Sequence, residues 1–260
     1  MSLNPLRKKL QSDQTTLGLW VTMECASITE IAVALNIDWV VVDMEHGHLD
    51  YKDAMDHIRV VRETGTCIII RVPDIREDCI KRALDMGAHG VILPLARSAE
   101  DVERGFQFGR YAPRGVRGIG GERAVKWGLG FKDYLEVANE ETMIIPMIET
   151  REAGEDIDKI LEIEGLETIF LGPADMSATY NHLGEWEGGD TAQLNLQIRE
   201  KAAAKGIATG VVSTSLDNAK ERQEQGFKMV ALGSDAGLLI RSIQESMVAL
   251  GCDAKPHLWF

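Results

Sequence analysis

Short apolar runs recur along the whole chain, and amphipathic stretches separate them. Nearly every interval between runs carries apolar residues at helical spacing, as in DYKDAMDHIRVVRE and DAGLLIRSIQESMVAL. Strands that alternate with helices indicate βα units and a parallel sheet. The runs that have the length and β-branched content of buried strands are 17–22, 38–44, 67–72, 90–95, 142–149, 168–173, 207–212 and 228–233.

The number of these units predicts the architecture. Eight βα units in a chain of 260 residues predict a closed (β/α)8 barrel, or TIM barrel, formed by residues 1–260 as one domain. A doubly wound open sheet is the alternative, but it usually has fewer strands and an early phosphate-binding glycine turn, which we do not find. Residues 110–141 interrupt the rhythm with a Gly- and Arg-rich stretch that becomes helical near Phe131. Connections of this length are typical of functional loops, lids or subunit contacts.

Charge and composition narrow the class of partner. The formal net charge of −13 argues against a nucleic acid or an anionic membrane as the main partner. No apolar run approaches the roughly 18 residues of a membrane span, and the first residues show no apolar core of a signal peptide. Because the four cysteines form no CxxC pair, we expect reduced thiols and a cytoplasmic location.

Titratable residues gather where the predicted strands end. The stretch DMEHGHLD directly follows a buried strand, and a barrel of this kind has its active site at the carboxyl ends of the strands. These ends therefore define the candidate site. The residues there include Trp20, Asp43, Glu45, His46, Arg71, Glu149, Gly172, Pro173, Ala174, Asp175, Ser213 and Ser234.

Glu149 and Asp175 follow adjacent strands. Adjacent strands lie about 4.8 Å apart, so both carboxylates could bind one cation. Two carboxylates with few nitrogen ligands suit Mg²⁺ or Mn²⁺, with water and substrate oxygens completing the shell. Each residue alone is better explained as a helix cap, but the pair in this setting favours a metal.

Arg71 and the Asp43–His46 pair are the other candidate catalytic groups. An arginine at a strand end suits a carboxylate or enolate oxygen, because it keeps its charge and offers a planar fork. The alternative is a structural salt bridge with Asp43 or Glu45. An aspartate that fixes the tautomer of a nearby histidine makes a general base, which is the hypothesis for Asp43 and His46.

Several chemistries are excluded by what the strand ends lack. No lysine ends a predicted strand, which argues against a Schiff-base aldolase. Neither a GxSxG elbow nor a nicotinamide-binding glycine fingerprint is present, and the histidines do not match the amidohydrolase pattern. What remains is metal-assisted chemistry on a small oxyanion, in which a cation and Arg71 stabilise an enolate.

The chain resembles the HpcH/HpaI aldolase family from about residue 17 to 177, and more weakly to residue 250. The resemblance implies a barrel of the phosphoenolpyruvate/pyruvate-binding type and a class II pyruvate aldolase that uses Mg²⁺, Mn²⁺ or Co²⁺. The stretches that carry it, in the family's order, are DMEHG (43–47), RVP (71–73), RALDMGAHGVILP (82–94), RYAPRGVRG (110–118), IET (148–150) and GPADMS (172–177).

The resemblance also implies a role for individual residues. Glu149 and Asp175 would bind the metal, and Arg71 would hold the keto or enolate oxygen of pyruvate. His46, oriented by Asp43, would be the acid–base. The substrate pocket would further include Trp20, Met147, Gly172, Pro173 and Ala174, with backbone amides around Gly172–Asp175 taking the carboxylate.

The same resemblance implies an oligomer. Asp85 resembles a residue that reaches the site of a neighbouring subunit, with help from Arg123 and the 110–130 loop. Relatives form trimers of dimers that exchange the last helix, here 235–249.

One departure bears on the reaction. Relatives carry Gln where this chain has Met147, and a thioether cannot replace the amide's hydrogen bonds. We expect reversible retro-aldol cleavage of a 4-hydroxy-2-oxo acid, such as a 2-keto-3-deoxy sugar acid or a dihydroxyheptenedioate-like diacid, to pyruvate and an aldehyde. The alternatives are decarboxylation of an oxaloacetate-type diacid at the same site and a non-catalytic protein that binds small acids.

Overall fold

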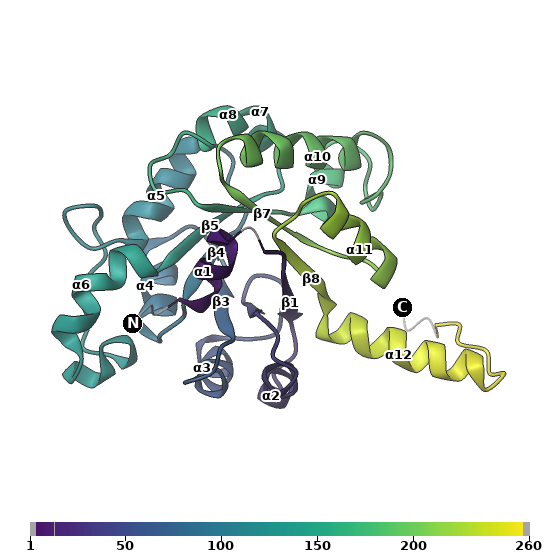
Figure 1. The fold of residues 1–260 in the computed structure, drawn as a ribbon, viewed down its shortest axis with the longest axis horizontal. Helices are drawn as coiled ribbons and strands as arrows, with labels where there is room; N and C mark the ends of the chain where they lie inside the picture. Colours follow the sequence, from purple (N-terminus) through teal and green to yellow (C-terminus); the bar gives the residue numbers. More distant parts are fainter. Residues whose placement is uncertain (1–3, 13, 257–260) are drawn as a thin grey trace.

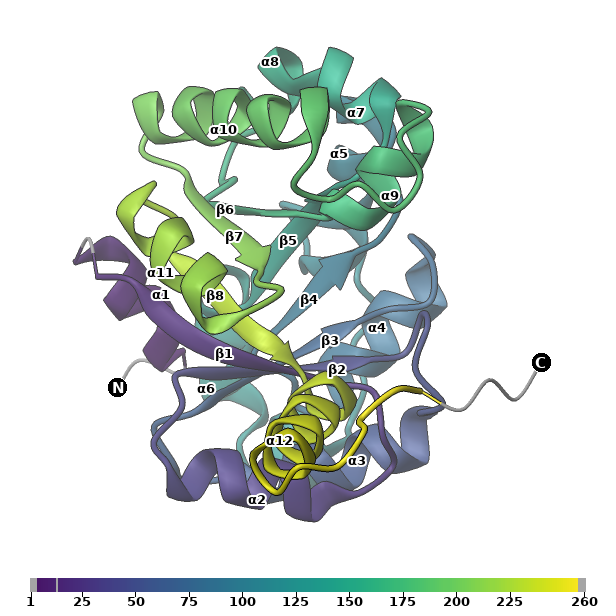
Figure 2. The same cartoon turned by 90° about the vertical axis from the view of Figure 1, so that its right-hand side faces the viewer.

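A computed structural model describes residues 4–12 and 14–256. All eight predicted strands are present and parallel, and they close into a barrel in chain order (Figures 1 and 2). The predicted (β/α)8 fold is therefore confirmed, with strand ends within two residues of their predicted positions. The strands are β1 (Thr16–Val21), β2 (Trp39–Asp43), β3 (Cys67–Arg71), β4 (Gly90–Leu93), β5 (Met143–Ile148), β6 (Thr168–Leu171), β7 (Ala208–Val212) and β8 (Met229–Ser234).

Helices surround the barrel and follow each strand. They are α1 (Pro5–Gln11), α2 (Ala26–Ala34), α3 (Tyr51–Val60), α4 (Glu77–Asp85), α5 (Ala99–Gly109), α6 (Phe131–Glu141), α7 (Arg151–Glu155), α8 (Ile157–Ile160), α9 (Pro173–Thr179), α10 (Gly189–Ala204), α11 (Leu216–Glu224) and α12 (Asp235–Ala249). The 110–141 segment contains a short 3-10 helix, η1 (Arg123–Gly128), before α6. No helix in the described part of the chain is long and apolar enough to cross a membrane.

The first helix, α1, was not predicted. A proline in its first turn and the Asn4 side chain, which accepts a hydrogen bond from the backbone N–H of Arg7, start it locally. Leu6 is fully buried among the side chains of the barrel interior. The helix therefore contributes an apolar side chain to the barrel core.

Strand β2 shows why the strands read as unbroken apolar runs. Trp39 and Val41 point into the barrel interior, while Val40 and Val42 face the helices, so both faces of the strand are buried. In the interior, the aromatic rings of Trp39 and Phe170 leave no room for a side chain on the neighbouring strands. A Cβ on Gly18 would lie 2.1 Å from Trp39 Cδ2, and a Cβ on Gly210 would lie 2.3 Å from Phe170 Cδ2.

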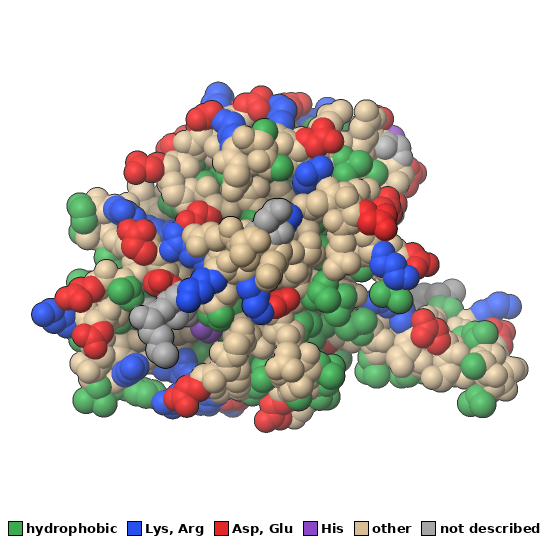
Figure 3. Space-filling model, in the orientation of Figure 1, with side chains coloured by type: hydrophobic (Ala, Val, Ile, Leu, Met, Phe, Trp, Pro, Cys, Tyr) green, Lys and Arg blue, Asp and Glu red, His purple; other side chains and the backbone are tan. Residues whose placement is uncertain are grey.

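Helix α12 extends away from the barrel (Figure 1). Its first residue, Asp235, accepts hydrogen bonds from the backbone N–H groups of Thr22 and Met23 and from the Thr22 hydroxyl. This contact anchors the helix to the loop after β1. Hydrophobic side chains remain exposed along the rest of α12, including Leu239, Ile240, Ile243 and Val248. Figure 3 shows hydrophobic side chains at the surface where this helix leaves the barrel.

We predict that Gly18→Ala destabilises the protein by about 1–3 kcal/mol, because the fully buried Trp39 ring must move to admit the methyl group. The measurement is the urea midpoint of unfolding. Gly121→Ala is the matched control, since a Cβ there meets nothing within 4 Å. Equal midpoints for the two variants would contradict this account of the barrel interior.

Candidate active site

A cavity of about 460 Å³ opens at the carboxyl ends of the strands. Most residues predicted for the site line it, and Glu45, Asp85, Arg123 and Glu149 are the exceptions. The lining residues are Trp20, Asp43, His46, Arg71, Met147, Gly172, Pro173, Ala174, Asp175, Trp186, Val212, Ser213, Thr214, Gly233, Ser234, Gly237 and Arg241.

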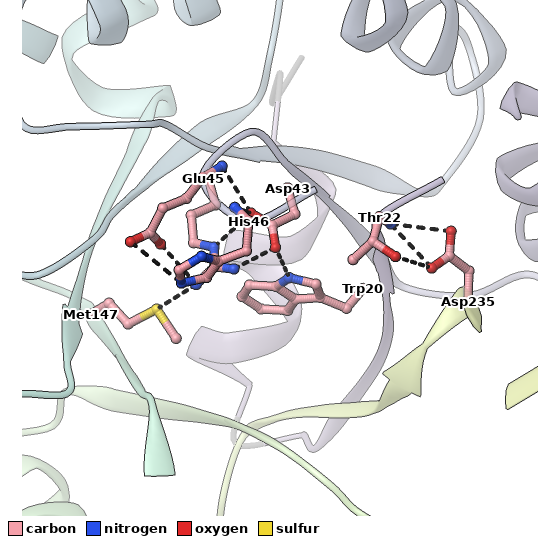
Figure 4. Close-up of polar contacts among 8 residues, drawn as sticks. Trp20, Thr22, Asp43, Glu45, His46, Met147 and Asp235 are labelled. Atoms are coloured by element: carbon pink, nitrogen blue, oxygen red, sulfur yellow. Dashed lines mark hydrogen bonds and ion pairs between the residues drawn. The ribbon is translucent and has the colours of Figure 1, made fainter. Parts of the chain in front are cut away.

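Asp43, the last residue of β2, is a centre of hydrogen bonds (Figure 4). Its carboxylate accepts from Arg71 Nε at 2.9 Å, from Arg71 Nη2, and from Trp20 Nε1 at 3.1 Å. The parallel register of β2 and β3 places Asp43 beside Arg71. Burial opposes ionisation of Asp43, but the hydrogen bonds and charge of Arg71 outweigh it and hold its pKa below the ordinary value.

The structure corrects the predicted orientation of His46 by Asp43. Asp43 accepts the backbone N–H of His46 at 3.2 Å, but the carboxylate lies between Arg71 and Trp20 and makes no bond to the His46 ring. The ring's Nε2 lies 3.7 Å from Glu45 Oε1 instead, and the His46 side chain is 62% exposed. His46 therefore stands at the mouth of the cavity beside Glu45.

Arg71 forms salt bridges with Asp43 and Glu45, which was the alternative to a substrate-binding role, and it also lines the cavity. Besides its bonds to Asp43, its Nη1 lies 2.9 Å from Glu45 Oε2 and 3.9 Å from Met147 Sδ. Its guanidinium also lies over the Trp20 ring. Burial alone would lower the pKa of Arg71, but the Asp43 hydrogen bond and the surrounding carboxylates raise it. The guanidinium is thus a fixed, permanently charged group at the cavity wall.

Glu149 follows β5 and is completely buried. Its Oε1 accepts the backbone N–H of Leu95 at 2.7 Å, while Oε2 has no hydrogen-bond partner among the described residues. Burial, reinforced by the charges of Glu45 and Asp175, raises the pKa of Glu149 to about 7. Gly172 makes room for this carboxylate, because a Cβ there would lie 2.5 Å from Glu149 Oε2.

Asp175 lies in the first turn of α9 and faces the cavity. Its charge raises the pKa of Glu149 and of Glu45, so the three carboxylates share one electrostatic neighbourhood. Among the described residues, no three His, Cys, Asp or Glu side chains converge as a metal-binding group. A buried carboxylate oxygen without a partner, next to a second carboxylate, nevertheless fits a hard cation that takes its other ligands from water and substrate.

Asp85 and Arg123 do not reach this cavity. Helix α4 leads from the carboxyl end of β3 back toward the amino end of β4, and Asp85 is its last residue. There Asp85 Oδ1 accepts from Arg117 Nη2 at 2.7 Å, and Arg123 Nη1 donates to the Met86 carbonyl at 2.9 Å. Neither residue contributes to the site of its own chain.

Comparison with known proteins identifies the family to which this barrel belongs. The model of the HpcH/HpaI aldolase/citrate lyase family matches residues 16–242. The chain belongs to the HpcH/HpaI aldolase/citrate lyase family. It is 29% identical over 251 residues to the hydroxypyruvate/pyruvate aldolase of Paraburkholderia phytofirmans, covering 94% of this chain and 96% of that one. It is 32% identical over 235 residues to the 4-hydroxy-2-oxovalerate aldolase of Novosphingobium aromaticivorans, covering 90% and 89%.

Solved structures of HpcH/HpaI proteins share the fold. A family member from Burkholderia cenocepacia superposes with a TM-score of 0.90 at 26% identity, covering 95% of this chain and 99% of that chain. The sequence resemblance to the family is therefore confirmed.

Not every cavity residue was identified from the sequence, and three of those missed carry a polar or aromatic side chain. Trp186 lies in the loop between α9 and α10, Thr214 follows β7, and Arg241 belongs to α12. Thr214 had a signal, since it follows the predicted strand end at Ser213. Trp186 and Arg241 had none, because neither adjoins a strand end and only the folded chain brings them to this HpcH/HpaI cavity.

We predict a pH-dependent stability difference between the metal-free wild-type protein and Glu149→Gln. The folded-state pKa of Glu149, about 7, exceeds its ordinary value of 4.5, so ionisation works against folding. Stability is therefore full below about pH 4.5 and falls as pH rises toward 7. A glutamine at this position cannot ionise, so Glu149→Gln does not lose stability in this way. From pH 5 to pH 8, its free energy of unfolding relative to the wild-type protein should therefore rise by at most about 3 kcal/mol.

Urea unfolding at both pH values, with chelator present, measures this difference. Glu152→Gln, on exposed α7, is the control and should show no such trend. A gain for Glu149→Gln that is equal at pH 5 and pH 8 would contradict the raised pKa.

Proposed function

We propose that this protein is a carbon–carbon lyase that cleaves a 4-hydroxy-2-oxo acid reversibly to pyruvate and an aldehyde, with the help of a divalent metal. The observation that carries the proposal is the unpartnered, buried Oε2 of Glu149, whose carboxyl group lies close enough to Asp175 and Arg71 for both charges to act on it. The names of the aldolases that the chain resembles support the same reaction class.

Glu149 and Asp175 would hold the metal, for which Mg²⁺, Mn²⁺ and Co²⁺ are suitable hard or borderline cations. When bound, the metal supplies a Lewis acid that stabilises negative charge developing at the 2-oxo oxygen. It would also offset the mutual repulsion of Glu149, Asp175 and Glu45.

Arg71 would also bind the 2-oxo oxygen of the substrate. Asp43 and Glu45 hold its guanidinium in place, so the charge is already positioned before the substrate arrives. The N–H groups of Ala174 and Asp175, in the first turn of α9, would donate hydrogen bonds to the substrate carboxylate, whereas Pro173 has no N–H to donate. Met147 brings a thioether beside Arg71, so no side-chain amide competes for the guanidinium at this position.

His46 would move the proton. In the cleavage direction its ring takes the proton of the 4-hydroxyl group, directly or through a water molecule. The C3–C4 bond then breaks, its electron pair forms the enolate of pyruvate, and the aldehyde leaves. A proton delivered to C3 of the enolate completes pyruvate. The exposed position of the ring, next to Glu45 at the cavity mouth, suits this exchange with solvent.

Pyruvate release from a panel of 4-hydroxy-2-oxo acids tests the proposal. Chelator-treated protein should be inactive, and Mg²⁺, Mn²⁺ or Co²⁺ should restore release. Glu149→Gln and Asp175→Asn should each lose at least about a hundredfold in kcat/KM, because each removes charge that holds the metal. Borohydride added with substrate should not inactivate the protein, since no Schiff base forms.

Glu152→Gln serves as the control for this experiment and should keep full activity. Metal-independent release by folded protein, or full activity of Glu149→Gln, would sink the metal-dependent mechanism. Failure to release pyruvate from any substrate with any metal would sink the aldolase assignment itself.

We further propose that the protein assembles as a trimer of dimers in which α12 packs on a partner subunit. The exposed apolar side chains of α12 support this assembly, because a helix with such a face normally packs against another surface. Asp85 and Arg123, which lie away from their own cavity, would then contribute to a neighbouring site.

We predict that Ile240→Glu combined with Ile243→Glu reduces the assembly to smaller species, because two charges would be buried in the contact. Light scattering after size-exclusion chromatography gives the mass. Leu183→Glu adds a charge at an 82% exposed leucine away from α12 and should leave the mass unchanged. A double variant with the mass of the wild-type protein would refute a role for this face.

A further inference from the structure

Two arginines line the cavity, and only one of them is paired with carboxylates. Arg71 lies against Asp43 and Glu45. Arg241 makes no ion pair with any acidic side chain in the described part of the chain, although it is half-buried in the cavity wall. Its positive charge is therefore free to act on a bound molecule.

The position of Arg241 is fixed by the fold. It lies near the beginning of α12, whose first residue Asp235 is tied to the loop after β1. Its guanidinium donates to the carbonyl of Thr214 at 3.0 Å and to that of Leu232 at 2.8 Å. Of the five N–H donors of the fork, three remain for a ligand.

The backbone of β8 makes room for this guanidinium. Gly233 has a φ of +123°, a conformation that side-chain-bearing residues rarely adopt. A Cβ at this position would lie 3.0 Å from Arg241 Nη2. The glycine therefore allows the arginine to lie over the end of the strand, on the cavity wall.

Apart from Arg241, the cavity lining that comes from the loop before α10, from the ends of β7 and β8 and from α12 is uncharged, and it includes Trp186, Val212 and Thr214. The carboxylates and Arg71 belong to the ends of β2, β3 and β5 and to α9. A substrate whose 2-oxo acid end lies at Arg71 and Asp175 would direct the rest of its chain along this uncharged wall. Its far end would then meet the guanidinium of Arg241.

We propose that Arg241 binds a second carboxylate, carried at the far end of the aldehyde portion of the substrate. This inference rests on the proposed aldolase function and narrows its substrate to a 2-oxo dicarboxylic acid, with an aldehyde acid as the second product. A planar guanidinium matches a carboxylate in geometry. A single arginine, with no lysine or third arginine among the cavity-lining residues, suits one negative charge better than a phosphate dianion.

The test is aldol addition of pyruvate to aldehyde acids of two to five carbons, each compared with an uncharged alkyl aldehyde of the same length. The wild-type protein should favour at least one acid over its uncharged counterpart by tenfold or more in kcat/KM. Arg241→Gln should lower this preference about ten- to a hundredfold, mainly through KM, since a charge-assisted hydrogen bond is lost. Arg59→Gln, at an exposed arginine of α3, is the matched control and should keep the preference.

The outcomes separate a binding role from a structural one. If Arg241→Gln lowers kcat/KM equally for charged and uncharged aldehydes, Arg241 only supports the loop after β7, and the proposal is overturned. A wild-type protein that shows no preference overturns it too, while leaving the aldolase function intact. Arg241→Lys keeps the charge without the fork and should retain part of the preference, should the Gln variant fold poorly.

A binding measurement keeps the proposal testable without turnover. In the presence of Mn²⁺, calorimetry should show that 2-oxoadipate binds more tightly than 2-oxohexanoate to the wild-type protein, and that Arg241→Gln removes the difference. A phosphate-bearing 2-oxo acid of similar length that binds more tightly than 2-oxoadipate would overturn the choice of carboxylate. Equal binding of the two acids by the wild-type protein would overturn the proposal as a whole.

Discussion

The buried ion pair between Asp43 and Arg71 organises the site. Parallel pairing of β2 and β3 places the two residues side by side, and both side chains are almost completely shielded from water. Removing one partner of such a pair leaves a buried charge unpaired and destabilises the folded protein by about 3–5 kcal/mol. The pair also determines what its neighbours can do: Trp20 donates to Asp43, Glu45 takes the free edge of Arg71, and His46 is left to face the solvent. The stability of the barrel and the position of the Arg71 guanidinium, for which we propose a catalytic role, therefore depend on the same contact.

Around that pair, the cavity carries an excess of negative charge. The charge of Asp175 raises the pKa of Glu45 and of Glu149, the charge of Glu45 adds to the effect on Glu149, and Arg71 is already matched by Asp43. Carboxylates gathered in this way are costly in a dry cavity unless a cation or a proton joins them. A proton on Glu149, favoured by its raised pKa, reduces the repulsion among these carboxylates. A divalent metal would reduce it as well. At the proposed metal site, a proton on Glu149 would compete with the metal, so the affinity for the metal would increase with pH through the neutral range.

The fold was readable from the sequence because a (β/α)8 barrel repeats one local pattern, and because each strand, buried on both faces, appears as an unbroken apolar run. Placing the site at the strand ends followed from topology, and it identified Asp43, Arg71 and Asp175 correctly as cavity residues. The error at His46 had a physical source. Sequence proximity suggested that Asp43 would contact its ring, whereas the neighbouring strand supplied a stronger partner in Arg71. Trp186 and Arg241 could not be found because their approach to the cavity depends on how a loop and a helix pack.

Helix α12 carries both a residue of the cavity and an exposed apolar face. Its first turns carry the anchor Asp235 and the cavity residue Arg241, and its later turns carry the exposed apolar side chains, Ile243 among them. A helix is stiff over this length, so a force on its far end is transmitted to its beginning. A partner that packs on the apolar face would therefore also restrict the movement of Arg241 at the cavity wall. Assembly would then improve discrimination between substrates without adding any contact to them, because an arginine already held in place loses less entropy when it binds a carboxylate.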